Sequence, residues 1–100
     1  MPPGFNAWYA NGGSTYYGPS FAVANIDGLA DGMLTYNHSS YSTSLIGNYS
    51  LAWIQKVATD GSNLPFMAYI APKACHDPFQ PAPWYTETWK EDWPAVSLAS

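Results

Sequence analysis

The pattern of apolar and polar positions predicts a loop followed by a β-hairpin in the first part of the chain. Residues 1–20 are crowded with Pro, Gly, Asn and Ser, which favour turns and predict a loop. Short apolar runs then follow, broken at Asp27-Gly28 and Asp31-Gly32, and Asp-Gly pairs are typical of hairpins. The pattern predicts two antiparallel strands, residues 21–26 and 32–36. The Ala-rich part of the first strand also fits a helix.

Beyond the hairpin the apolar positions recur at steps of three and four residues, as on one face of an amphipathic helix. These positions are Leu45, Ile46, Tyr49, Ala52, Trp53 and Val57. Ser42 or Thr43 can cap the start of the helix, and Asp60-Gly61-Ser62 can end it. The sequence therefore predicts a helix of about 17 residues whose apolar face needs a sheet or another helix to cover it.

A continuous apolar run at residues 65–71 predicts a strand that is buried on both faces, as in the centre of an α/β sheet. A helix followed by such a strand is half of a βαβ unit, so the predicted class is α/β. Three prolines in residues 78–83 predict a loop after the strand. Residues 84–91 fit a short C-terminal helix.

Composition suggests a surface that needs further protein to cover it. Charged residues make up 10% of the chain, against about 25% in an average soluble domain. The aromatic content of 17% brings more apolar area than a unit of 100 residues hides easily. We expect one incomplete unit spanning residues 1–100.

Charge and hydropathy exclude several partners. The net charge of −4 and the presence of only three cations, Lys56, Lys73 and Lys90, argue against binding to nucleic acid. No run of about 18 apolar residues predicts a membrane span, and no signal peptide is visible at the start. The sequons at Asn37 and Asn48 fit N-x-(S/T) and suggest glycosylation in an exported protein, although such short motifs also arise by chance.

Candidate chemistry lies just after the predicted buried strand, at Lys73, His76 and Asp77. Ligands of open α/β sheets bind at the carboxyl ends of the strands, so this position is the candidate site. A cation and an imidazole can contact an anionic group, and the imidazole can also donate a proton to a leaving oxygen. The alternative is structural, because a His beside prolines can simply hydrogen-bond its loop. His38 sits in a polar segment and is expected to be an exposed residue without a role.

Residues 65–79, PFMAYIAPKACHDPF, resemble the sulfatase segment P-F-(F/L)-x-(Y/L)-x-A-P-x-A-P-H-x-P-(F/W). Residues 81–85 are similar to the A-P-x-Y that follows it in the family, and residues 41–43 to the start of the preceding helix. Weaker similarity to N-acetylglucosamine-6-sulfatase-like members extends to residues 2–5 and to a strand around Tyr16-Tyr17. The chain departs from the pattern at Cys75, where Pro is usual, and at Ser44, where Asp is usual.

The resemblance implies a fragment of an alkaline-phosphatase-like fold and a hydrolase of sulfate monoesters on sugars or glycosaminoglycan-like polysaccharides. His76 then contacts sulfate and assists the leaving oxygen, while Lys73 either attracts sulfate or pairs with Asp77. The family's calcium ion and its formylglycine nucleophile are expected in the complete protein, with no ligand for either in this chain. Cys75 lacks the C-x-P-S-R context of a formylglycine precursor. The implied location is secreted, lysosomal or extracellular.

Two other functions stay open at this point. A carbohydrate-binding module would use exposed Trp8, Trp84, Trp89 and Trp93 as platforms for sugar rings. Such modules are usually all-β, which the predicted helix and buried strand do not suit. A phosphodiesterase of the same fold would use a Thr or Ser nucleophile instead of formylglycine.

Overall fold

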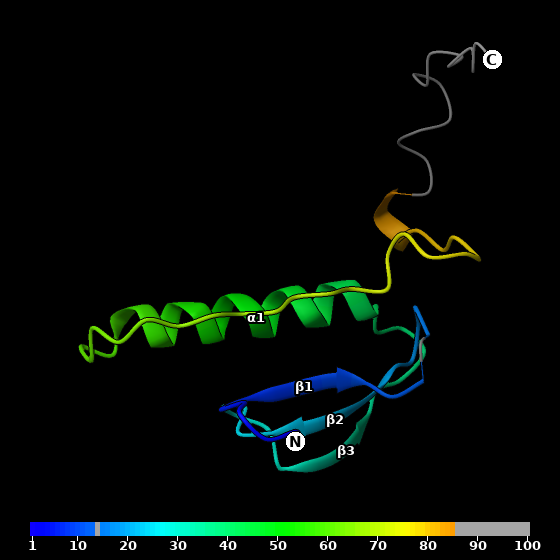
Figure 1. Ribbon diagram of the computed structural model, residues 1–100. Helices are drawn as coiled ribbons and strands as arrows, with labels where there is room; N and C mark the ends of the chain where they lie inside the picture. Colours follow the sequence, from blue (N-terminus) through cyan, green and yellow to red (C-terminus); the bar gives the residue numbers. More distant parts are fainter. Residues whose placement is uncertain (14, 86–100) are drawn as a thin grey trace, which may run out of the picture.

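The computed structural model describes residues 1–13 and 15–85 and shows one small antiparallel sheet beneath one long helix (Figure 1). The elements in chain order are β1 (Trp8–Asn11), β2 (Ser20–Ala24), β3 (Gly32–Thr35), α1 (Ser42–Thr59) and a 3-10 turn at Pro83–Tyr85. The fold therefore combines a three-stranded antiparallel sheet with one helix. No helix within these described residues is long and apolar enough to cross a bilayer.

The sheet confirms the predicted hairpin and adds a strand that was predicted to be loop. Strand β2 lies between β1 and β3 and is antiparallel to both, with Phe21 opposite Leu34 and Ala22 opposite Ala10. The prediction of loop throughout residues 1–20 is wrong at β1. Its Tyr9 ring stacks on Phe21 at 4.0 Å between centroids, so an aromatic contact stabilises a strand between two turn-rich segments.

The hairpin connection is longer than a two-residue turn. Gly28 has a φ of 80°, a left-handed conformation that glycine adopts without a steric penalty. The carboxylate of Asp31 accepts a hydrogen bond from the backbone N–H of Asn25 at 2.9 Å, which closes the loop. The Asp27-Gly28 pair thus lies within the loop between the strands, and the Asp31-Gly32 pair lies where the loop joins β3.

Helix α1 confirms the predicted helix in position and length, with 18 residues. Its end is also as predicted, because Gly61 takes a φ of 77° just after the last turn. The predicted cap is wrong: the N-cap residue is Tyr41, and the hydroxyls of Ser42 and Thr43 are buried without a partner. The backbone N–H of Ser42 is instead bound by the carbonyl of Tyr16 at 2.7 Å.

Aromatic side chains join the sheet to the helix. Phe21 is 0% exposed, and Tyr9 contacts both Phe21 and Tyr49 of α1, at 4.0 Å and 4.9 Å between ring centroids. The Tyr9 hydroxyl donates to the hydroxyl of Tyr36 at 3.2 Å. Burial and this hydrogen bond raise the pKa of Tyr9, and a hydrogen bond with Tyr36 raises the pKa of Tyr49. The helix therefore rests on the sheet through rings whose hydroxyls stay protonated.

The predicted buried strand at residues 65–71 is wrong. The structure gives this segment no strand partner and leaves it exposed, with Met67 at 80% and Tyr69 at 84%. The chain doubles back here along α1, where Phe66 packs edge-on against Trp53 at 5.7 Å (Figure 1). A strand buried on both faces needs a neighbouring strand for its backbone hydrogen bonds, and none of the described strands pairs with it.

We predict that Phe21→Ala lowers the free energy of unfolding by about 3 to 5 kcal/mol, because it removes a fully buried ring from the centre of the sheet. Urea unfolding followed by circular dichroism measures this change. Met33→Ala is the matched control, since Met33 is 68% exposed on β3. Equal losses in the two variants would show that Phe21 is not the centre of the core.

We predict that alkaline pH weakens the contact between sheet and helix. The folded state raises the pKa of Tyr9 and Tyr49 above the usual value near 10. Their contribution to stability is therefore complete below about pH 10 and is lost as the pH rises beyond it. Urea unfolding at about pH 8 and about pH 11 measures the loss. A smaller pH dependence is expected for Tyr36→Phe, and equal stability of the original chain at both values would contradict the prediction.

Candidate functional site

Three tyrosine hydroxyls hold the Pro-rich loop that carries the candidate residues. Each donates a hydrogen bond to a backbone carbonyl of the loop, and we call this set of three residues the tyrosine clamp. The bonds run from Tyr16 to His76 at 2.5 Å, from Tyr41 to Gln80 at 2.7 Å and from Tyr17 to Pro81 at 2.6 Å. Since these partners lie 39 to 64 residues apart in sequence, the clamp is what ties the loop to the folded part of the chain.

The clamp is built where the segment before β2 meets the start of α1. Tyr17 and Tyr41 form an isolated antiparallel bridge, and the rings of Tyr16 and Tyr41 stack at 6.0 Å. Both are buried, and Ala82 of the loop completes their cluster. Burial raises the pKa of Tyr16, so its hydroxyl stays protonated and remains a donor.

His76 lies in the loop as predicted but not in a crevice. Its side chain is exposed, and it lines neither the hollow between α1 and the 3-10 turn nor the one between α1 and the hairpin loop. Its Nδ1 is 2.5 Å from the carbonyl of Asp77, and because a carbonyl only accepts, Nδ1 must carry a proton. In the neutral ring Nε2 is then the acceptor, and in the charged ring it is a donor. The prediction of a buried strand delivering His76 into a crevice is therefore wrong in this structure.

Lys73 is also held by the clamp. Its ammonium lies over the ring of Tyr16, 5.1 Å from the centroid, a cation–π arrangement. Its carbonyl accepts a hydrogen bond from the backbone N–H of His76 at 2.8 Å, which closes the turn between them. The sequence suggested that Lys73 either attracts sulfate or pairs with Asp77. The structure shows a third interaction, the contact of its ammonium with the Tyr16 ring.

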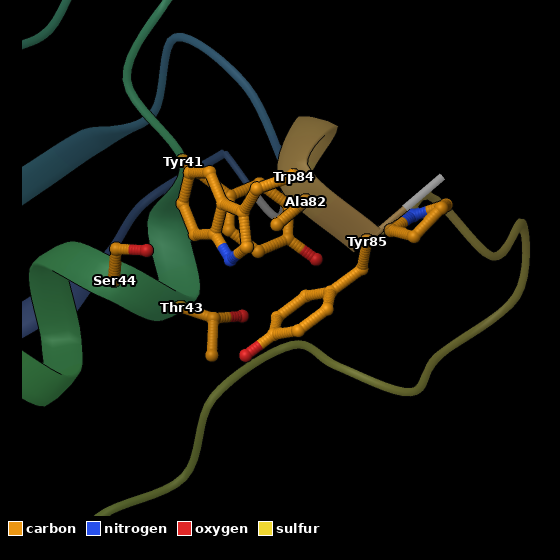
Figure 2. A pocket seen from close by; sticks show the side chains of 7 residues that line it. Tyr41, Thr43, Ser44, Ala82, Trp84 and Tyr85 are labelled. Atoms are coloured by element: carbon orange, nitrogen blue, oxygen red, sulfur yellow. The ribbon is translucent and has the colours of Figure 1, made fainter. Parts of the chain in front are cut away.

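A cavity of about 460 Å³ lies beside the clamp, between the first turn of α1 and the 3-10 turn (Figure 2). It is lined by Tyr41, Thr43, Ser44, Pro81, Ala82, Trp84 and Tyr85. Sequence reasoning singled out Trp84 as a sugar platform but not its neighbours. Residues 41–44 and 81–85 are distant along the chain, and no local pattern signals that they meet.

The structure describes two of the four tryptophans considered above as platforms for sugar rings. Trp84 is 59% exposed, whereas Trp8 is half-buried and packs edge-on against Phe5 at 5.1 Å. Trp89 and Trp93 lie outside the described residues, as does most of the predicted C-terminal helix, of which the 3-10 turn at Pro83–Tyr85 overlaps the start.

Both sequons are accessible. Asn37 and Asn48 are exposed, the first in the connection to α1 and the second on the helix. The side-chain oxygen of Asn37 accepts hydrogen bonds from the backbone N–H and hydroxyl of Ser39, at 3.1 Å and 2.5 Å. His38 is exposed, as predicted.

Neither the calcium ion nor the formylglycine implied by the resemblance fits the described residues. Within residues 1–13 and 15–85, no three His, Cys, Asp or Glu side chains gather so as to hold a metal ion. Cys75 is an exposed thiol in the loop, followed by His and Asp instead of the residues of a formylglycine motif. No chemical step can therefore be assigned to either group here.

Comparisons with models of protein families, with curated proteins and with solved structures found no match to this chain. The site therefore has to be interpreted from its own residues.

We predict that Tyr16→Phe releases the loop around His76, because it removes one hydroxyl donor and leaves a carbonyl without its partner. The free energy of unfolding falls by about 0.5 to 1.5 kcal/mol, and amide shifts change at residues 75–78. Heteronuclear NMR measures both effects. Tyr69→Phe is the control, since Tyr69 is 84% exposed. Unchanged shifts around His76 in Tyr16→Phe would contradict the role of the clamp.

Proposed function

We propose that this chain is a segment of a sulfuric ester hydrolase, a sulfatase with an alkaline-phosphatase-like fold that acts on sulfate monoesters of sugars or polysaccharides. The observation that carries the proposal is the sequence of residues 65–79, which follows the sulfatase pattern at nine of its eleven specified positions, including Pro72 and His76, and departs from it at Met67 and Cys75. A motif of this length arises by chance less often than a three-residue sequon or a single cysteine, so it is the more specific indication of a family. In this proposal His76 is the catalytic residue.

The loop geometry supports a role for the His76 side chain. The clamp binds the carbonyl of His76 and not its ring, so anchoring leaves the imidazole exposed. The contact of Nδ1 with the carbonyl of Asp77 orients the ring and leaves Nε2 for a ligand. Lys73, one turn earlier, adds a positive charge near the same loop.

The proposed step is general-acid assistance to the leaving group. The charged imidazole donates its Nε2 proton to the ester oxygen as the S–O bond breaks. The bond's electron pair stays on that oxygen, which leaves as an alcohol, and the ring becomes neutral. The sulfuryl group passes to a nucleophile supplied by another part of the enzyme. Such assistance contributes about 10²- to 10⁴-fold in rate.

The exposed apolar run supports the proposal that further protein completes the domain. Its largest exposed side chains are Leu64, Phe66, Met67, Tyr69 and Ile70. A contiguous apolar surface of this kind marks a contact with other protein. In the proposed complete enzyme, other protein would cover these exposed side chains.

The rest of the proposed enzyme supplies what these residues lack. The nucleophile and any metal ion belong to other parts of the protein, since the described residues offer neither. The exposed sequons at Asn37 and Asn48 are compatible with an exported, secreted or lysosomal enzyme.

We predict that the 100-residue chain alone does not hydrolyse p-nitrophenyl sulfate, and that His76→Ala in the complete enzyme lowers kcat by about 10²-fold or more. His38→Ala is the matched control, because His38 is exposed and lies outside the loop. Steady-state kinetics on p-nitrophenyl sulfate measure both variants.

An unchanged kcat in His76→Ala would remove His76 from the mechanism. Activity of the complete enzyme on bis-p-nitrophenyl phosphate but not on the sulfate ester would favour the phosphodiesterase alternative. Turnover by the purified 100-residue chain would show that the nucleophile lies within it.

A further inference from the structure

We infer that Tyr16 is a positioning residue for the reaction proposed above, because its one side chain holds Lys73 with its ring and His76 with its hydroxyl. This inference rests on the proposed function, since it gives Tyr16 a part in the reaction of His76. Tyr16 itself touches neither the substrate nor the reacting atoms in this scheme. Its part is to place an ammonium and an imidazole together on one loop.

The hydroxyl of Tyr16 fixes the backbone of His76. It donates to the carbonyl of His76 itself, at 2.5 Å, so the anchor lies on the residue that carries the imidazole. The contact of Nδ1 with the carbonyl of Asp77 then limits rotation of the ring. A proton donor acts only within hydrogen-bond reach of its partner, so both contacts bear on the position of Nε2.

The ring of Tyr16 fixes the side chain of Lys73. The ammonium lies 5.1 Å from the ring centroid, within the distance of about 6 Å at which an aromatic face attracts a cation. Lys73 is half-buried, which restricts a side chain that otherwise samples many rotamers. The backbone N–H of His76 also donates to the carbonyl of Lys73, at 2.8 Å. Lys73 and His76 are therefore linked twice, through the turn and through Tyr16.

Tyr16 is held firmly enough to serve as this support. It is 3% exposed, and its ring stacks with that of Tyr41 at 6.0 Å between centroids. Its own carbonyl accepts a hydrogen bond from the backbone N–H of Ser42 at 2.7 Å, which ties it to the first turn of α1. A site keeps its geometry when packing and hydrogen bonds lock the groups behind it, and Tyr16 meets both conditions.

The other tyrosines of the clamp bind a different part of the loop. The hydroxyls of Tyr41 and Tyr17 donate to Gln80 and Pro81, which lie beyond His76 in the chain. Loss of the Tyr17 hydroxyl therefore frees the loop at Pro81 and not at His76. Tyr17→Phe separates a general loosening of the loop from a specific effect on His76.

Placing Lys73 and His76 together suits an anionic substrate group. The ammonium attracts the anion while the charged imidazole donates a proton to its leaving oxygen. Binding and proton donation then depend on different parts of Tyr16. The ring supports binding through Lys73, and the hydroxyl supports proton donation through His76.

The first test is NMR of the 100-residue chain in three variants, Tyr16→Phe, Tyr16→Leu and Tyr17→Phe. An aromatic face shifts the protons held over it upfield, so the Lys73 methylene beside the ammonium should keep this shift in Tyr16→Phe and lose it in Tyr16→Leu. The imidazole signals of His76 should change in both Tyr16 variants. They should keep their positions in Tyr17→Phe. If circular dichroism shows that Tyr16→Leu does not fold, Tyr16→Phe carries the test, since it keeps the buried ring.

The second test is steady-state kinetics of the complete enzyme on p-nitrophenyl sulfate. Tyr16→Phe should lower kcat about tenfold with KM almost unchanged, because only the anchor of His76 is lost. Tyr16→Leu should also raise KM several-fold, because Lys73 loses its support. A merely structural role would lower kcat equally in Tyr16→Phe and Tyr17→Phe.

The inference is overturned if Tyr16→Leu leaves the Lys73 signals unchanged, or if Tyr17→Phe disturbs the His76 ring or lowers kcat as much as Tyr16→Phe does. Equal KM in the two Tyr16 variants would likewise overturn it. A complete enzyme without sulfatase activity would remove the proposed reaction, whereas the NMR signals would still show whether Tyr16 places Lys73 and His76. Failure of the proposed function and failure of the placement are therefore distinguishable.

Discussion

The structure depends on hydrogen bonds from three tyrosine hydroxyls to backbone carbonyls of the Pro-rich loop. Prolines prevent this loop from joining a helix or a sheet ladder, so its carbonyls need donors from elsewhere. Tyrosine suits the task because its ring packs in an apolar cluster while its hydroxyl reaches a carbonyl at the edge. Tyr16 and Tyr41 do both, since they are buried together with Ala82 and still bind the loop. The positions of His76 and of the cavity walls follow from these contacts.

The same use of aromatic rings explains how so small a fold hides part of its apolar content. Tyr9, Phe21 and Tyr49 join sheet and helix, and the clamp joins helix and loop. Among the described residues, the apolar run at residues 64–70 stays largely uncovered, although its Phe66 packs edge-on against Trp53 of α1. We propose that other protein covers this exposed run, which would also explain the low charge of the chain. The proposed sulfatase domain would provide that cover.

The sequence correctly predicted the elements that depend on residues close together in the chain. The Asp-Gly pairs predicted the hairpin, and the apolar stripe with the stop signal at Asp60-Gly61-Ser62 predicted α1 and where it ends. Strand β1 was missed because turn-forming residues surround it and its stability comes from Tyr9 stacking on Phe21, a contact between strands. The strand at residues 65–71 was wrong because its burial depends on partner strands that the described residues do not provide. For the site, the sequence located Lys73 and His76 on a loop, but not the clamp or the cavity. Both arise from residues far apart in the chain.

The most direct test of this account is a nuclear Overhauser measurement on the chain in solution. If the tyrosine clamp holds the loop, the ring protons of Tyr16 show contacts with His76, and those of Tyr41 show contacts with Gln80 and the methyl group of Ala82. A loop with random-coil shifts and no contacts to either tyrosine ring would contradict the account.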